Sequence, residues 1–260
     1  LTFAANPANT EYHCTEVKDR NGNYISVSYD SSTGNINTVT DTLGRVITFH
    51  YDSYNNIQSI TQPWGSTTHT WASFGWATTP IGSGIFSGTN YSGPTRGSSS
   101  IAVLSQVGLA DGSKYCFDYD GSYGMISAIK YYAPDDNPSG TRHERRQVTY
   151  AYDTSSGQVP RVNSEKDWAE NWNGDTNGVP ATNGSEEVET TFSQSSGVGT
   201  MTLPDSTVYK EFYGSTWKSG LVTMTKNYLN ASAASSDSDS SPTWKKKTVT
   251  TWTQDNESVS

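Results

Sequence analysis

Residues 19–65 decide the fold, and their sequence is DRNGNYISVSYD, SSTGNINTVT, DTLGRVITFHYD, SYNNIQSITQPWG. When Gly22 is aligned with Gly44, the residues that follow fall into register and Tyr29 lies over Tyr51, at an offset of 22 residues. The second half repeats at an offset of 21 residues. Self-similarity at this period indicates a repeat architecture.

Each repeat has the pattern of a β-hairpin. Asp-x-x-Gly favours a turn, because the Asp carboxylate can hydrogen-bond to the backbone of the turn and Gly can adopt a positive φ angle. Ile25, Val27 and Tyr29 then alternate with serines, which predicts a strand with one buried face. A second turn at Ser31–Gly34 leads to a return strand containing Ile36 and Val39. A lone hairpin cannot bury its apolar face, so neighbouring hairpins are expected to stack.

About five units are visible at uneven spacing. Their shared residues are expected to be structural, with buried tyrosine rings and carboxylates that accept turn N–H groups. They are Tyr29, Asp30, Tyr51, Asp52, Tyr119, Asp120, Tyr152, Asp153, Gly22, Gly44, Gly65 and Gly112; a fifth, degenerate unit contains Tyr213. The predicted division is a lead-in strand (1–18), YD repeats (19–71), a Gly/Pro-rich insertion (72–100), YD repeats (101–162), an insertion loop and strand (163–200), a degenerate YD repeat (201–229), a low-complexity linker (230–242) and a terminal strand (243–260).

The order D-x-x-G, alternating apolar residues, Tyr-Asp and then Gly-Asn-Ile resembles the RHS or YD-repeat family. The resemblance is closest over residues 19–65. It implies an all-β fold, in which consecutive antiparallel β-hairpins form a curved, spiralling open sheet, a shell-like strip, with long loop insertions. Toxin members of the family often cleave themselves near a D-P-x-G motif, which this sequence lacks.

The resemblance also implies a role. The expected function is a structural module of an exported or cell-surface, toxin-related protein that acts as a scaffold, an encapsulating shell, or an assembly or adhesion surface without catalysis. The expected location is secreted, extracellular or cell envelope. Open sheet edges are expected to pair with flanking repeats of the same polypeptide or with another copy. A carbohydrate-binding surface module is the alternative, with glycans as partners, and a glycoside hydrolase-like enzyme with a carboxylate pair is the second.

Composition agrees with a β-rich chain and excludes some partners. The 260 residues include 23 Gly, 16 Tyr and 8 Trp, which suits short strands and frequent turns. The net charge of −9 argues against nucleic acid. No apolar run predicts membrane insertion. The chain begins at Leu1 without a visible signal peptide, so a fragment or mature segment of a longer protein is expected.

The two cysteines leave two alternatives. Cys14 and Cys116 are the only cysteines of the chain, and in an exported β-rich protein they could form one disulfide. Two free thiols are the other interpretation. Cys116 has the parity opposite to the aromatic residues of its strand.

No catalytic residue and no cofactor is predicted. The four histidines lack metal-ligand spacing, and no P-loop, G-x-S-x-G or G-x-G-x-x-G motif is present. The group Glu186, Glu187 and Glu189 is the acidic cluster considered for a hydrolase. No metal site is predicted beyond a weak calcium candidate at Asn173, Asp175 and Asn177, which lacks the Glu required at position twelve.

Two aromatic residues are candidates for ligand binding. Trp168 and Trp172 lie in a Gly/Asn-rich segment that is expected to be a loop. Exposed indoles can stack on sugar rings, whereas packing into a small satellite core is the structural alternative.

Overall fold

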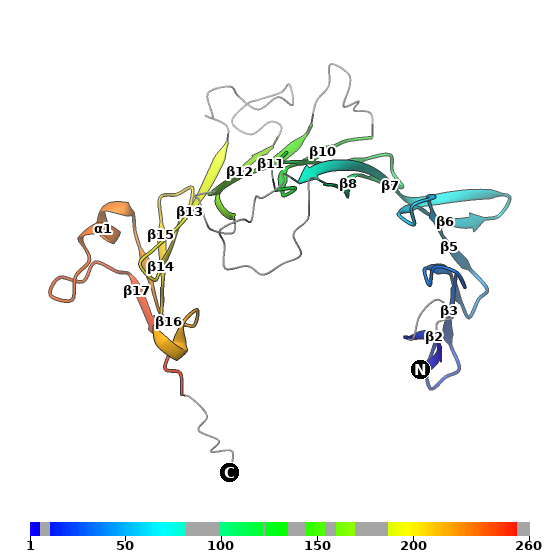
Figure 1. Ribbon diagram of the computed structural model, residues 1–260, viewed down its shortest axis with the longest axis horizontal. Helices are drawn as coiled ribbons and strands as arrows, with labels where there is room; N and C mark the ends of the chain where they lie inside the picture. Colours follow the sequence, from blue (N-terminus) through cyan, green and yellow to red (C-terminus); the bar gives the residue numbers. More distant parts are fainter. Residues whose placement is uncertain are drawn as a thin grey trace, which may run out of the picture. The chain divides into compact units, whose positions relative to one another are not determined.

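The computed structural model describes residues 1–5, 11–81, 99–121, 123–134, 144–153, 160–169 and 187–253. These residues form seventeen β-strands, one α-helix and a short 3-10 helix. The predicted all-β fold class is therefore confirmed. The chain divides into two compact units, with a boundary between Arg146 and Gln147 at the start of strand β11 (Figure 1).

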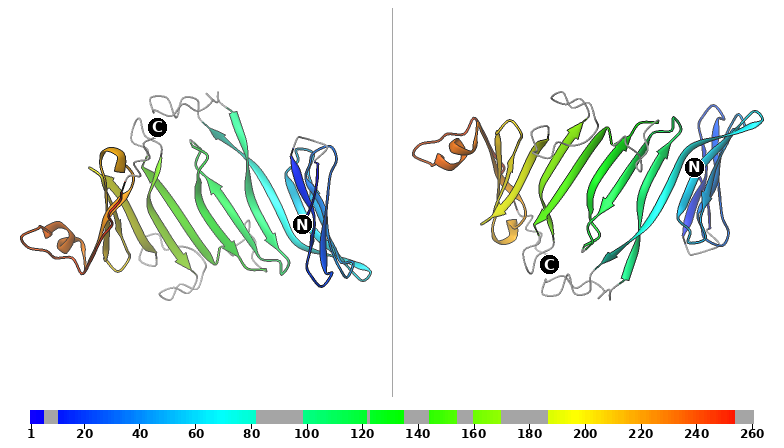
Figure 2. Two further views of the ribbon diagram at one scale, coloured as in Figure 1. Left: turned by 90° about the horizontal axis from the view of Figure 1, so that it is seen from below. Right: turned by 90° about the horizontal axis from the view of Figure 1, so that it is seen from above.

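The first unit is an antiparallel meander, in which each strand pairs with the next one along the chain. The predicted succession of antiparallel hairpins is thus confirmed, and Figure 2 shows these strands side by side from two directions. The strands are β1 (Thr2–Ala5), β2 (Tyr12–Lys18), β3 (Tyr24–Tyr29), β4 (Ile36–Asp41), β5 (Val46–Tyr51), β6 (Ile57–Trp64), β7 (Thr67–Ile81), β8 (Ser99–Leu109), β9 (Lys114–Tyr119) and β10 (Ile126–Tyr132).

The repeated tyrosine occupies an equivalent place in each described hairpin, at the end of its first strand. Tyr29 lies opposite Ile36, whereas Ser28 lies opposite Thr38, so Asn37 is an extra residue in the ladder. Such a β-bulge bends the strand and increases its twist. The same bulge follows the pairs Tyr51–Ile57, Tyr119–Ile126 and Tyr213–Val222.

Turn length explains why the repeat offset changes from 22 to 21. The N–H of Asp30 donates to the carbonyl of Asn35 at 2.8 Å. After the next tyrosine, the N–H of Asp52 donates to Asn56 at 2.9 Å, which closes a turn one residue shorter. Asn55, at φ 64°, takes the left-handed position in this shorter turn. The strand register is therefore kept although the turn has lost a residue.

The apolar side chains of the first repeats lie on one face of the sheet. Val27 pairs with Val39, which pairs in turn with Ile47, while Ser28 and Thr38 lie on the opposite face. This apolar face is only half-buried. Among the described residues of the first unit, the buried hydrophobic side chains are Val103, Ala128 and Tyr132. Within the described residues of the first unit, the sheet is a single layer and no second layer covers its apolar face (Figure 2).

The first part of the predicted insertion at 72–100 is strand. Strand β7 continues through these positions to Ile81 and pairs with β8 from Ala72–Leu109 to Ile81–Ser99. A bulge next to Gly75 interrupts the alternation, which explains why the sequence pattern was lost there. Residues 82–98 lie outside the described part of the chain.

The second unit is also antiparallel, and strands β12 to β17 pair in chain order. Much of the predicted insertion at 163–200 is therefore strand. The elements are β11 (Arg146–Asp153), β12 (Arg161–Ala169), β13 (Val188–Ser195), β14 (Val198–Thr202), β15 (Val208–Tyr213), the 3-10 helix (Thr216–Lys218), β16 (Val222–Tyr228), helix α1 (Ala231–Ser236) and β17 (Lys246–Val249).

Helix α1 corrects the prediction of a low-complexity linker at 230–242. The side chain of Asn230 caps the helix by accepting the N–H of Ala233 at 2.9 Å. Ala234 is buried against Val208 and Tyr228, which form the hydrophobic cluster of this unit. The serine-rich composition did not predict this short capped helix, because its apolar face is small.

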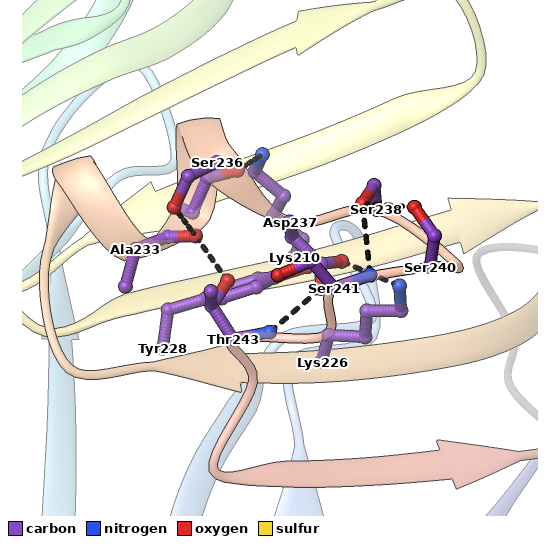
Figure 3. A network of polar contacts seen from close by, with 11 residues as sticks. Lys210, Lys226, Tyr228, Ala233, Ser236, Asp237, Ser238, Ser240, Ser241 and Thr243 are labelled. Carbon is purple, nitrogen blue, oxygen red and sulfur yellow. Dashed lines mark hydrogen bonds and ion pairs between the residues drawn. The ribbon is translucent and has the colours of Figure 1, made fainter.

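A polar network holds α1 against β15 and β16 (Figure 3). The ammonium of Lys226 lies 2.6 Å from the Oδ2 of Asp237, and the hydroxyl of Tyr228 donates to the same oxygen at 2.9 Å. Lys210 donates to the carbonyl of Ala234 at 2.8 Å. Lys226 and Asp237 side chains are only 9% and 7% exposed, so the pair is shielded from water.

One turn carries a residue that its backbone does not favour. The N–H of Ser206 donates to Leu203, as the N–H of Gly112 donates to Leu109, so the two turns match. The φ angles are 70° for Ser206 and 89° for Gly112, and positive φ is unfavourable for any residue with a Cβ.

We expect Ser206→Gly to raise the free energy of unfolding by about 0.5 kcal/mol, since relief of the left-handed strain exceeds the added entropy of the unfolded chain. Gly112→Ser is the matched reverse change and should destabilise by a similar amount. Urea unfolding midpoints measure both variants, and destabilisation by Ser206→Gly would contradict the assignment of strain.

Candidate functional site

Three of the repeated tyrosines bond across the sheet to backbone carbonyls. The hydroxyl of Tyr29 donates to the carbonyl of Cys14 at 2.8 Å, that of Tyr51 to Ile36 at 3.0 Å, and that of Tyr119 to Leu104 at 2.6 Å. Each bond spans 15 residues. Burial raises the pKa of Tyr51 and of Tyr119, so these hydroxyls stay protonated and act as donors.

Two tryptophans make the same type of contact. The indole Nε1 of Trp76 donates to the carbonyl of Ile57 at 2.7 Å, and that of Trp252 to Val222 at 2.8 Å. Ile57 and Val222 each lie opposite a repeated tyrosine, as Ile36 does. An aromatic donor therefore bonds to this position of the repeat whether the donor is a phenol or an indole.

The repeated aspartates organise the turns. The Oδ1 of Asp30 accepts the backbone N–H groups of Ser32 at 2.9 Å and Thr33 at 2.8 Å, together with both of their hydroxyls. The Ser32 hydroxyl and these further donors lower the pKa of Asp30 to about 2. Asp52 accepts from Tyr54 and Asn56 in the same way, and a hydrogen bond from the Asn56 side chain lowers its pKa.

The second unit contains a groove of about 740 Å³ that is lined by residues of strands β11 to β15. Its lining combines aromatic, aliphatic and charged side chains. Neighbouring strands bring Phe192 opposite Met201, and Met201 opposite Tyr209. We call this the β11–β15 groove; its lining residues are Asp153, Arg161, Val162, Asn163, Phe192, Ser193, Gln194, Gly199, Thr200, Met201, Tyr209, Glu211 and Tyr213.

Glu211 is fixed in the groove by two tyrosines of its own strand. Its Oε2 accepts the hydroxyl of Tyr213 at 2.7 Å, and its Oε1 accepts that of Tyr209 at 3.4 Å. The first bond raises the pKa of Tyr213. Gly199 leaves the space for this ring, because a Cβ there would lie 3.2 Å from the Tyr213 hydroxyl. Arg161 donates to the amide oxygen of Gln194 at the same groove.

An aromatic cluster is exposed at the end of the β6–β7 hairpin. The ring of His69 makes edge contacts with Trp64 and Trp71, with centroids 5.6 and 4.6 Å apart. The Nε1 of Trp71 donates to Gln62 at 3.0 Å. Gln62 and Trp64 have the strand parity of Ile60, so the cluster continues the apolar face of the first unit.

Comparison with known proteins agrees with this geometry. Residues 29–67 match the family model described as RHS Repeat, a range that includes the Tyr51 hairpin and its aspartate turn. The chain contains RHS repeats. No curated protein sequence matches the chain.

Two solved structures are similar to this chain. One, of TcdB2-TccC3-TEV, has 16% sequence identity and a TM-score of 0.49, and the match covers 87% of this chain and 10% of the other. The second, of TcdB2-TccC3-Cdc42, has 16% identity and a TM-score of 0.46, and covers 79% and 9%. The chain thus spans about one tenth of the length of the structures that it matches.

Cys14 and Cys116 are both free in the structure, which agrees with two free thiols and not with the disulfide alternative. Cys14 lies on β2 and Cys116 on β9. These strands are seven positions apart in the meander, and strand spacing of about 4.8 Å separates them well beyond disulfide reach. Burial raises the pKa of the Cys116 thiol, which keeps it protonated.

The predicted aromatic ligand site is not formed as expected. Trp168 lies within β12 rather than in a loop, and it is 1% exposed, so its ring cannot stack on a ligand. Trp172, the calcium candidates Asn173, Asp175 and Asn177, and Glu186 all lie outside the described residues. Glu187 pairs with Lys166 at 3.4 Å. Tyr152 and Asp153 lie on β11, but the turn that follows them is also outside the described part.

Sequence reasoning missed the β11–β15 groove. The alternation Tyr209, Glu211, Tyr213 signals one face of a strand, but the strands beside it follow segments without a repeat pattern. Within the described ranges, no cluster of three or more His, Cys, Asp or Glu could hold a metal, and no helix is long and apolar enough to cross a bilayer.

Proposed function

We propose that this chain is a wall segment of a longer exported or cell-surface RHS protein, whose apolar face is covered by other parts of that protein or by what it encloses. The RHS match and the hairpin geometry support a structural repeat module. The enclosure, the export and the edge pairing with flanking repeats or a second copy belong to the proposal.

One observation carries it. The polar groups of the repeated residues bond within the sheet: tyrosine hydroxyls bond to carbonyls and aspartates bond to their own turns. Such residues hold a surface in place rather than react. The face that they support presents Ile25 at 45% exposure and Trp64 at 66%, which is an extended apolar surface for a soluble chain.

The test compares the two faces of one strand. In a Cys14→Ser, Cys116→Ser background, Ile25→Cys places a thiol on the apolar face of β3 and Ser28→Cys places one on the polar face. Both positions are exposed in this chain. In the full-length protein, a bulky maleimide should label Ile25→Cys at least roughly tenfold more slowly than Ser28→Cys.

The isolated chain is the control, and there the two thiols should react at similar rates. Equal rates in the full-length protein would contradict the covered wall, because the apolar face would then be open to solvent.

A further inference from the structure

We propose that the end of the β6–β7 hairpin, residues 62–71, binds the surface of a zwitterionic lipid bilayer through its exposed tryptophans. The hairpin end lies among the lipid headgroups in this proposal and does not cross the bilayer. The inference does not depend on the proposed wall, because it concerns residues beyond the last pairs that the hairpin makes with its neighbouring strands.

The hairpin end is a two-stranded ribbon that extends beyond the strands beside it. The last pair between β5 and β6 is Thr48–Thr61, and the pairing of β7 with β8 begins at Ala72–Leu109. Within the described residues, the hairpin beyond these two pairs is held only by the ladder between β6 and β7. Figure 2 shows this hairpin, in cyan, extending past the neighbouring blue strands. Both edges of the ribbon are therefore open.

The ribbon presents aromatic rings that are held in place by one another. Trp64 is 66% exposed and Trp71 is 43% exposed. The ring of His69 makes edge contacts with both, and the indole of Trp71 donates to Gln62. Gly65, at φ 60°, closes the tight turn next to Trp64. Because the rings are ordered before a partner arrives, binding costs less conformational entropy.

The hairpin lies in a stretch without Asp, Glu, Lys or Arg. Between Asp52 and Arg96 none of these residues occurs, although they make up 17% of the chain. Both signs of charge occur at the other turns at this end of the first unit, where Asp19, Asp41 and Asp111 stand beside Arg20, Arg45 and Lys114. Such an end matches a zwitterionic surface, whereas the net charge of −9 for the chain opposes an anionic one.

The residue types match the headgroup region of a bilayer. Tryptophan combines a large apolar ring with a polar N–H and is enriched where a membrane meets water. Thr67, Thr68 and Thr70 lie along the same strand, and their hydroxyls can bond to headgroups or water. The open edges of the ribbon carry backbone groups that need such partners, which limits the hairpin to the hydrated layer.

The experiment measures partition of the full chain onto phosphatidylcholine vesicles by sedimentation. We expect binding, and we expect weaker binding when phosphatidylserine is added to the vesicles. Trp64→Ala combined with Trp71→Ala should lower the partition coefficient by at least roughly tenfold, because two exposed rings are lost. Trp217→Ala is the matched control, since Trp217 is 46% exposed but lies in the second unit, and it should leave the coefficient unchanged.

A dye at the turn gives a second measurement that keeps both tryptophans. In a Cys14→Ser, Cys116→Ser background, Ser66→Cys carries the polarity-sensitive dye NBD at the hairpin end, and Ser53→Cys carries it at the opposite end of β6. Both serines are exposed. On addition of phosphatidylcholine vesicles, the emission should shift to the blue at position 66 and stay unchanged at position 53.

Several results would overturn the assignment. These are no partition of the unaltered chain onto phosphatidylcholine, equal partition of the double variant and the unaltered chain, or the same spectral shift at positions 66 and 53. Tighter binding to vesicles with phosphatidylserine would also contradict it. Self-association of the chain that the double variant abolishes, without vesicle binding, would assign the hairpin end to a second copy instead.

Discussion

Lys226→Ala should lower the thermal unfolding midpoint by on the order of 10 °C. The change removes the cation 2.6 Å from Asp237 and leaves a shielded carboxylate without its charge partner. Because Asp237 also accepts from Tyr228 and from the N–H of Thr243, its disturbance loosens the segment that docks α1. Circular dichroism gives the midpoint, and limited proteolysis near residue 236 reports release of the helix.

The strand partner of Lys226 provides the control. Lys247 lies opposite Lys226 in the β16–β17 ladder but is exposed, so Lys247→Ala should change the midpoint by no more than about 2 °C. Lys226→Met combined with Asp237→Leu should recover much of the loss, because both charges are then removed together. Equal effects of Lys226→Ala and Lys247→Ala would show that the ion pair does not hold α1.

Acid unfolding should also distinguish Lys226→Ala from the unaltered chain. The Lys226 ammonium holds the pKa of Asp237 at about 2, below its ordinary value of 3.8. The contribution of Asp237 to stability is therefore complete above pH 3.8 and is lost as the pH falls towards 2. Lys226→Ala removes the main cause of the lowered pKa, so its acid unfolding should begin at a higher pH.

Loss of three tyrosine hydroxyls should destabilise the first unit by about 3 kcal/mol. In the triple variant Tyr29→Phe, Tyr51→Phe and Tyr119→Phe, each change removes one hydrogen bond to a backbone carbonyl, worth about 1 kcal/mol. The three lie on strands β3, β5 and β9, so their effects should add. Urea unfolding measures the sum.

Tyr54→Phe is the control for this series. The Tyr54 side chain is 83% exposed, so loss of its hydroxyl should change stability by less than about 0.5 kcal/mol. If the triple variant unfolds at the same urea concentration as Tyr54→Phe, the cross-strand bonds are not a source of stability.

Local sequence patterns predicted the strands of the first unit well. The alternation around Tyr29, Tyr51 and Tyr119 placed three strands correctly, because period-two patterning depends on the residues of one strand alone. The bulge after each tyrosine was not predicted, since the extra residue in the partner strand has no distinctive side chain: it is Asn37 in one hairpin and Gln58 in another.

Features that depend on contacts between strands distant in the sequence were not predicted. Trp168 was assigned to a loop because its neighbours are polar, yet β12 buries it. The β11–β15 groove draws on five strands separated by segments without repeat pattern, so no single window of sequence signals it. Helix α1 was missed because its buried face is a single small residue, Ala234.

The meander also has a consequence for how the chain reaches its native state. In the described part of the first unit, strands β1 to β10 pair with their immediate neighbours along the chain, so these hairpins can form without a distant segment. Such low contact order permits vectorial assembly, in which each ribbon adds to the one before it as the polypeptide leaves the ribosome or a translocation pore. The growing edge is then always the most recently made strand, and only the next few residues to emerge are needed to cover it.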